Sequence, residues 1–74
     1  MRLPSFKPKE LIRVLQAQGF VSDHQSGSHL TLRHSDGRRA VVPLHNRDLK
    51  RGTLMGIIKQ AGYSVMEFIE VIQR

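Results

Sequence analysis

Apolar side chains recur at helical spacing near the start of the chain. Leu11, Val14 and Leu15 lie on one stripe, which Gln18 continues at the same spacing, with Ile12 beside it. Pro8 suits the first turn of a helix, where its missing N–H costs no hydrogen bond. Gly19 is typical of a left-handed helix cap, after which Phe20 can fold back onto the last turn. The pattern predicts a helix from about Pro8 to Gln18.

The middle of the chain changes to strand-like patterning. Strands are expected over residues 20–25, 29–34 and 38–42. A turn at residues 25–28 separates the first two strands, and Ser35-Asp36-Gly37 predicts a hairpin because Asp and Gly tolerate the positive φ of tight turns. Pro43 ends the third strand, since proline cannot donate to a ladder.

The last part of the chain returns to helical spacing. A helix of about residues 51–61 has an apolar stripe made of Leu54, Ile57, Ile58 and Ala61. Gly62 ends it, and Ser64 with Glu67 forms the capping box of a third helix. The buried face of that helix consists of Val65, Phe68, Ile69 and Ile72.

The order α-β-β-β-α-α predicts an α+β fold with a three-stranded antiparallel sheet and the helices on one of its faces. The other face is then open to solvent or to a partner. With 74 residues, the chain is expected to form a single domain over residues 1–74 with a thin core. A closed substrate cavity is hard to build at this size, so any chemistry is expected on the surface or together with a partner.

The charge balance narrows the range of partners. Twelve Lys and Arg residues against six Asp and Glu give a net charge of +6 and a pI near 10.9. A small domain this basic attracts polyanions, with nucleic acid as the first candidate and an acidic protein as the second. The alternative is that the positive charge only keeps the chain soluble.

Other features of the sequence bear on location. The chain has no cysteine, which excludes disulfides and thiolate metal sites and is compatible with a reducing cytoplasm. No apolar run approaches the ~20 residues needed to span a bilayer. The first ten residues lack the apolar core of a signal peptide. A cytoplasmic protein without membrane contact is therefore expected.

The basic residues fall into two groups. Arg33, Arg38 and Arg39 bracket the predicted hairpin, and Arg47, Lys50 and Arg51 precede the second helix. The free N–H groups of that helix N-terminus offer a further phosphate site. Two basic groups at opposite ends of one strand pair fit a surface that follows a nucleic-acid backbone. The aromatic residues are assigned to the core, which does not support recognition by base stacking; they are Phe6, Phe20, Tyr63 and Phe68.

His29 is the candidate for chemistry. If Leu30 and Leu32 face the core, the alternation places His29 on the exposed sheet face together with Thr31 and Arg33. A histidine side chain can take or give a proton near neutral pH. RNA carries its own nucleophile, the 2′-hydroxyl, so a base and positive charge at the phosphate can suffice for cleavage. The other interpretation is an ordinary surface histidine in a strand.

Neighbouring residues complete the predicted site. Gly27 has no side chain to block an approaching phosphate, and the Ser28 hydroxyl could bind its oxygens. Positive charge would come from a nearby basic residue, for which the candidates are Arg33, Arg38, Arg39 and Lys50. Of the other histidines, His34 is expected to end its strand at the hairpin, and His24 and His45 are assigned to loop or rim positions. The histidine spacings match no known ligand pattern, so neither a metal nor another cofactor is expected.

Several segments together resemble the HicA family of small toxins, also called YcfA-like. The matching segments are "KELIRVLQAQGF", "GSHLTLRHSDGRRAVVP" and "LKRGTLMGIIKQAGYS". They span almost the whole chain in order, and as a set they are specific. Arg51 stands where the family often has proline, which adds charge at the helix start.

This resemblance implies a fold like that of a double-stranded-RNA-binding domain and a ribosome-independent mRNA endoribonuclease that halts growth. It places the family's catalytic histidine at His29 and its glycine and adjoining small residue at Gly27 and Ser28. It also implies a HicB antitoxin that covers the active face and takes part in repressing their shared operon. Two further hypotheses remain beside it: a non-catalytic RNA-binding module, and a basic module that docks an acidic, antitoxin-like protein.

Overall fold

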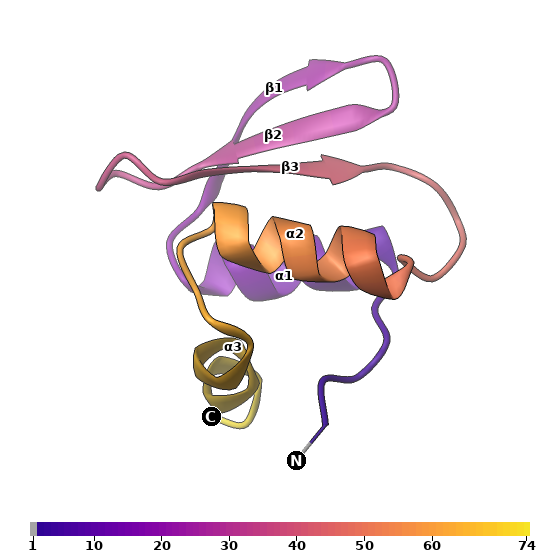
Figure 1. The fold of residues 1–74 in the computed structure, drawn as a ribbon. Coiled ribbons are helices and arrows are strands. Elements are labelled where there is room, and N and C mark those ends of the chain that lie inside the picture. Colours follow the sequence, from indigo (N-terminus) through magenta and orange to yellow (C-terminus); the bar gives the residue numbers. More distant parts are fainter. Residues whose placement is uncertain (1) are drawn as a thin grey trace.

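The computed structural model describes residues 2–74 and contains three helices and three strands (Figure 1). In chain order these are α1 (Pro8–Ala17), β1 (Val21–Ser26), β2 (His29–Arg33), β3 (Arg39–Pro43), α2 (Arg51–Gln60) and α3 (Val65–Ile72). Their order and type confirm the predicted α+β fold and its resemblance to a double-stranded-RNA-binding domain.

The strands form one antiparallel sheet in the order β1-β2-β3. On β2, Leu32 is fully buried and faces the helices, together with Ala40 and Val42 of β3. Figure 1 shows α1 and α2 side by side beneath the sheet, with α3 on their far side. The opposite sheet face is uncovered, as the sequence predicted.

The helix ends follow from local chemistry. Gly19 adopts a φ of 100° after α1, and the Phe20 N–H then donates to the Leu15 carbonyl (3.1 Å), as the left-handed cap requires. Gly62 takes the same role after α2 with a φ of 88°. The predicted capping box of α3 is present, because the Glu67 N–H donates to the Ser64 hydroxyl (3.1 Å).

One apolar cluster fills the space between the sheet and the helices. Its largest fully buried side chains are Phe20, Phe68, Leu11, Leu15, Leu32, Leu54, Ile58, Val42 and Pro8. Phe6 packs edge-on against Phe68 with ring centroids 6.1 Å apart, and Tyr63 does so at 5.7 Å. The assignment of the aromatic residues to the core is therefore confirmed.

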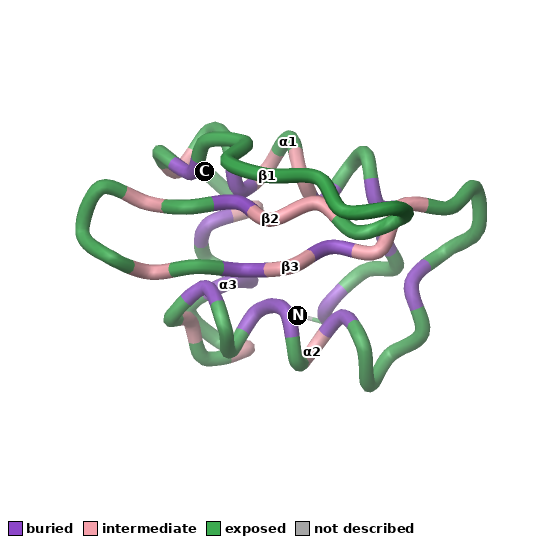
Figure 2. The backbone as a smooth tube through the Cα atoms, turned by 90° about the horizontal axis from the view of Figure 1, so that it is seen from above, coloured by how far each residue is buried: buried purple, intermediate pink, exposed green. Residues whose placement is uncertain are grey.

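Burial is uneven across the sheet. All six residues of β1 are exposed, whereas β3 alternates between buried and accessible positions and β2 has one buried residue, Leu32, after the half-buried Leu30 and Thr31 (Figure 2). β1 packs chiefly against β2, and Figure 1 shows it rising away from the helices. Its side chains therefore face solvent.

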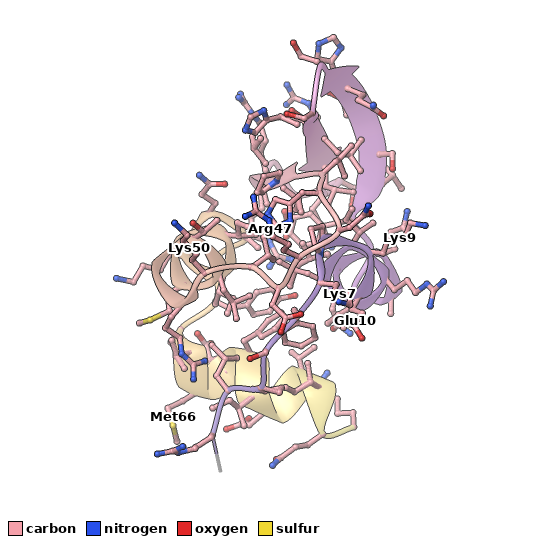
Figure 3. The ribbon with its side chains drawn as sticks, turned by 90° about the vertical axis from the view of Figure 1, so that its right-hand side faces the viewer. Lys7, Lys9, Glu10, Arg47, Lys50 and Met66 are labelled. Carbon is pink, nitrogen blue, oxygen red and sulfur yellow. The ribbon has the colours of Figure 1, made fainter. Side chains whose placement is uncertain are left out.

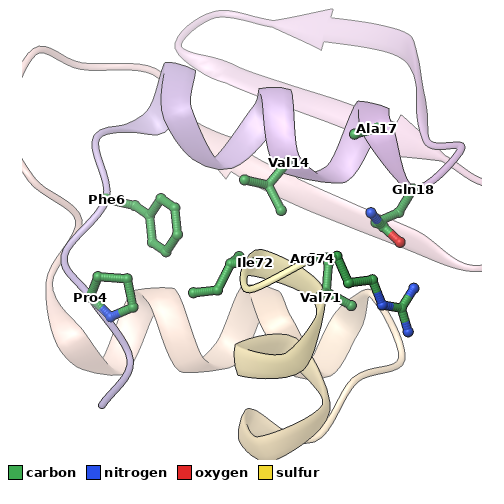
Figure 4. Close-up of a pocket in the computed structure, with 8 residues that line it drawn as sticks. All are labelled: Pro4, Phe6, Val14, Ala17, Gln18, Val71, Ile72 and Arg74. Carbon is green, nitrogen blue, oxygen red and sulfur yellow. The ribbon is translucent and has the colours of Figure 1, made fainter. Parts of the chain in front are cut away.

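An apolar pocket of about 510 Å³ lies where α1, α3 and the segment before α1 meet (Figure 4). Phe6, Val14 and Ile72 contribute to its lining. The helix layer separates it from the open sheet face, so it has no part in the candidate site. Among the described residues, no helix is long and apolar enough to cross a membrane.

Candidate functional site

The turn between β1 and β2 presents His29. Ser26 pairs with His29, so Gly27 and Ser28 form a two-residue turn, with Gly27 at a φ of 58°. Positive φ at the first turn position is typical of a type II′ hairpin, which glycine adopts without strain. An added side chain at Gly27 would meet nothing within 4 Å. The glycine is therefore explained by the turn, and the space around it is open.

His29 begins β2 on the open sheet face. Its side chain is exposed, and its cross-strand partner on β3 is Pro43. The Leu44 N–H donates to the Ser28 carbonyl (2.6 Å). This hydrogen bond extends the pairing of β2 and β3 by one residue beyond the His29–Pro43 pair. The predicted outward orientation of His29 is thus observed, and the backbone beneath it is held on both sides.

A basic pocket lies next to this end of the sheet. It measures about 350 Å³ and is lined by Pro43, His45, Arg47, Asp48, Leu49, Lys50 and Thr53. Pro43 belongs to both features, because it lines the pocket and pairs with His29. Figure 3, which looks onto this end of the molecule, shows Arg47 and Lys50 near the start of α2, with Lys7 and Lys9 at the start of α1.

Several contacts hold the loop that carries these cations. The Leu49 N–H donates to the Phe6 carbonyl (2.8 Å), and Lys7 forms an ion pair with Asp48 (3.7 Å). The Arg47 N–H donates to Nδ1 of His45 (3.2 Å), which fits the tautomer with the proton on Nε2. The loop is thereby tied to the segment before α1, and the pocket wall is fixed relative to the sheet.

The two predicted phosphate ligands at the start of α2, Arg51 and Lys50, differ in how far their side chains are already engaged. Arg51 donates from Nη1 to the Leu3 carbonyl (2.9 Å), so part of its guanidinium is already occupied. Lys50 occupies the N-cap position, where no side chain caps the helix, and its own side chain is exposed. Lys50 is therefore the freer cation of this pair.

The hairpin arginines lie at the other end of the sheet from His29. Arg33 and Arg39 pair with each other across β2 and β3, four residues along β2 from His29 and hence about 13 Å away. Arg33 also forms an ion pair with Asp23 (2.7 Å). The expectation that Arg33, Arg38 or Arg39 supplies charge beside His29 is wrong, because a strand's length separates them.

Arg38 is integrated into the fold. Its Nε donates to Asp36 (2.8 Å) and its Nη1 to the Ala61 carbonyl (2.9 Å). Its guanidinium lies 5.2 Å from the ring centroid of Phe20 and 5.3 Å from that of Tyr63. The Arg38 N–H and side chain also lower the pKa of the Asp36 carboxyl below its ordinary value. These contacts leave Arg38 with a structural role that the sequence did not reveal.

His34 has a matching position on the other side of the hairpin. Its Nδ1 lies 3.2 Å from the Asp36 backbone nitrogen and 3.1 Å from Asp36 Oδ1, and its Nε2 donates to the Gln18 carbonyl (3.1 Å). Its ring packs edge-on against Phe20 with centroids 5.1 Å apart. His34 thus ends its strand at the hairpin, as predicted, and is directed away from His29.

His24, which was assigned to a loop or rim position, lies in the exposed edge strand β1, where a strand was expected over residues 20–25. It pairs with Thr31 of β2. The register shifts between Ser22 and His24, so a β-bulge leaves Asp23 as the extra residue. A prediction that assumes a strict period of two along residues 20–25 cannot detect such a bulge. The Asp23–Arg33 ion pair is likewise seen only in the structure. Within residues 2–74, no group of three or more His, Cys, Asp or Glu residues could hold a metal ion.

Comparison with known proteins was decisive for the family. The model of the family described as "HicA toxin of bacterial toxin-antitoxin" matches residues 8–63, which is most of the chain. The chain belongs to the HicA toxin family. A comparison with curated protein sequences finds no match.

Membership in the HicA family confirms the resemblance seen in the sequence and makes this protein the toxin of a bacterial toxin–antitoxin system, with a HicB-type antitoxin implied as its partner. The match begins at Pro8, the first residue of α1, and ends at Tyr63, so it includes the whole sheet and its open face. The third helix, α3, lies outside the matched range. The open sheet face and both basic groups therefore lie within the matched range.

Proposed function

We propose that this HicA-family toxin is a metal-independent mRNA endoribonuclease that acts in the cytoplasm as a single domain of residues 1–74. His29 transfers a proton at the scissile phosphate. The observation that carries the proposal is the placement of His29: exposed on an uncovered sheet face, next to a two-residue hairpin turn, beside the basic pocket of Arg47 and Lys50.

The chemistry requires little from the protein. The RNA 2′-hydroxyl is the nucleophile, so the protein needs a proton acceptor or donor and positive charge for the developing phosphorane. His29 supplies the first. Lys50 and Arg47 supply the positive charge. They line the pocket together with Pro43, which pairs with His29 across the sheet. Gly27 and Ser28 leave room for the phosphate and offer an N–H and a hydroxyl.

The rest of the RNA would follow the open face toward Arg33 and Arg39. Backbone contacts of this kind give affinity without reading sequence. Arg51 contributes through the part of its guanidinium that Leu3 leaves unused. Arg38 is left out of this surface, because its guanidinium is engaged with Asp36, Ala61 and two aromatic rings.

The HicB-type antitoxin would silence the toxin by covering the same face. A protein with acidic groups opposite Lys50 and Arg47 would complement the toxin's charge of +6 and compete directly with RNA. In this arrangement, antitoxin binding and RNA binding exclude each other.

The test is incubation of purified toxin with an mRNA transcript, with and without EDTA, comparing wild type with His29→Ala and with Gln16→Ala as an exposed control on α1. We expect cleavage by wild type and Gln16→Ala in both buffers and none by His29→Ala, with unchanged thermal unfolding. Cleavage by purified His29→Ala contradicts the proposal. Salt-sensitive binding with intact RNA recovered would indicate a non-catalytic RNA-binding module, and negligible affinity at physiological salt a protein-docking module.

A further inference from the structure

We propose that His24 is a second catalytic residue, which works with His29 on the same phosphate as the other half of an acid–base pair. The inference rests on the proposed function and adds to it a group that the alternation of the sequence does not reveal. It is carried by the bulge in β1, by the register of β1 and β2, and by the exposure of both histidines.

The bulge decides which way His24 faces. Ser22 pairs with Leu32, whose side chain is buried against the helices. In a regular strand, His24 would face the same side as Ser22, because side chains two residues apart share a face. The extra residue Asp23 shifts the register, so that His24 instead pairs with Thr31 on the open face. Bulges of this kind re-aim a side chain and are frequent next to active sites.

The register also brings the two histidines together. His24 pairs with Thr31 and Ser26 pairs with His29, so the histidines occupy one diagonal of a four-residue patch on the open face. Diagonal neighbours in an antiparallel pair lie roughly 7–8 Å apart and are within reach of long side chains. Ser26 and Thr31 occupy the other diagonal. Their short hydroxyl side chains make the surface between the two rings polar and able to donate hydrogen bonds.

This spacing fits the geometry of RNA cleavage. The attacking 2′-oxygen and the departing 5′-oxygen lie on opposite sides of the phosphorus, and each needs a proton-transferring group within about 2.6–3.2 Å. Two imidazoles on one sheet diagonal can flank a single phosphate, whereas His34 and His45 lie off this patch. His34 is held against Gln18 beyond the far end of β2, and His45 lies in the loop after β3.

The proposed step is a transesterification at phosphorus in which the two histidines act as base and acid. One histidine, neutral, takes the proton of the 2′-hydroxyl while the 2′-oxygen forms a bond to phosphorus. The other, protonated, gives its proton to the 5′-oxygen as the bond between phosphorus and that oxygen breaks. The products are a 2′,3′-cyclic phosphate and a 5′-hydroxyl, and proton exchange with water restores both rings.

The charged groups around His24 come from the sheet. Asp23 precedes it in the bulge and is held in an ion pair by Arg33 (2.7 Å), and His29 lies across the diagonal. Because the Asp23 carboxylate already faces Arg33, it is not directed at His24. A base and an acid that act on one phosphate give a bell-shaped pH–rate profile, which is expected of the wild type.

The experiment first locates a cut site of wild type in an mRNA transcript and then uses a short RNA spanning that site. His24→Ala is compared with wild type, His29→Ala and the control Ser22→Ala on the helix-facing side of the same strand. We expect His24→Ala to lose about 10²-fold or more in kcat, as removal of a general acid or base does, with RNA affinity within a few-fold of wild type. We also expect Ser22→Ala to keep wild-type activity and His24→Ala to lose one limb of the bell-shaped pH profile.

A substrate whose leaving 5′-oxygen is replaced by sulfur separates the two roles, because a thiolate leaves without an acid. We expect this substrate to restore the rate of one histidine variant and not of the other. His24→Ala activity near wild type, or the same response of both variants to the sulfur substrate, overturns the inference while leaving the proposed function intact. Absence of cleavage by wild type overturns both.

Discussion

Arg38 and Ala61 are 23 residues apart in the chain, and the Arg38 guanidinium donates a 2.9 Å hydrogen bond to the Ala61 carbonyl at the end of α2. His34 makes the corresponding contact with Gln18 at the end of α1. Both carbonyls are among those that a helix end leaves without an intrahelical partner, and a cation there also faces the negative end of the helix dipole. One hairpin therefore holds the C-terminal ends of both helices under the sheet.

Replacing Arg38 is expected to destabilise the fold without removing a phosphate contact. Arg38→Ala should lower the free energy of unfolding by roughly 2 kcal/mol, because charged hydrogen bonds to Asp36 and Ala61 are lost and a half-buried side chain is removed. Urea unfolding measures this, with Arg39→Ala, an exposed neighbour, expected to stay within about 0.5 kcal/mol of wild type. Equal losses for the two variants would contradict the structural role.

Gly62 should tolerate no side chain. Its φ of 88° strains any other residue, and an added Cβ would lie 2.6 Å from Cδ of Arg38. Gly62→Ala is therefore expected to cost about 1–3 kcal/mol in unfolding free energy. Gly56 in the middle of α2 has open space around its Cα, so Gly56→Ala should instead stabilise by about 0.5–1 kcal/mol. Thermal or urea unfolding of the two variants should shift in opposite directions.

Acid should weaken the fold through two carboxyl groups. The Arg38 N–H lowers the pKa of Asp36, and the Ser64 N–H lowers that of Glu67. A carboxyl group whose pKa is lower in the folded state stabilises the fold above its unfolded pKa and loses this contribution as the pH falls through its folded value. The urea concentration at the unfolding midpoint should thus decrease as the pH is lowered below about 4.5. Asp36→Asn with Glu67→Gln should flatten this decline, and a decline as steep as that of the wild type would contradict the prediction.

The salt dependence of RNA affinity should distinguish the basic residues that contact RNA from those that do not. Each phosphate contact to single-stranded RNA contributes about 0.7 to the slope of log affinity against log salt. We expect Lys50→Ala and Arg47→Ala each to reduce the slope by about that amount in a titration with inactive His29→Ala toxin. Arg38→Ala in the same background should leave the slope unchanged. A reduced slope for Arg38→Ala would return this residue to the RNA surface.

The sequence predicted the elements because their signals are local. The stripe of Leu11 and Leu15, the glycine caps and the Ser64 capping box act within a few residues, and the alternation of Leu30 and Leu32 placed His29 correctly. The fold class followed from the order of these elements.

The site was harder to predict, because its residues meet through register. Nothing in the local pattern shows that Arg33 lies a strand's length from His29 while Pro43 lies opposite it. The exposed β1 carries no apolar alternation, so neither its bulge nor the outward position of His24 was visible. The role of Arg38 depends on Ala61 and Tyr63, more than twenty residues away.

The hairpin contacts also bear on how the chain reaches its fold. The carbonyls of Gln18 and Ala61 can accept hydrogen bonds from His34 and Arg38 only after the turn over residues 34–38 has formed. Neither of these two contacts can form before this turn closes, and closing it brings together segments from both halves of the chain. We expect the turn to form in the folding transition state, so that substitutions at Asp36 slow refolding more than they speed unfolding.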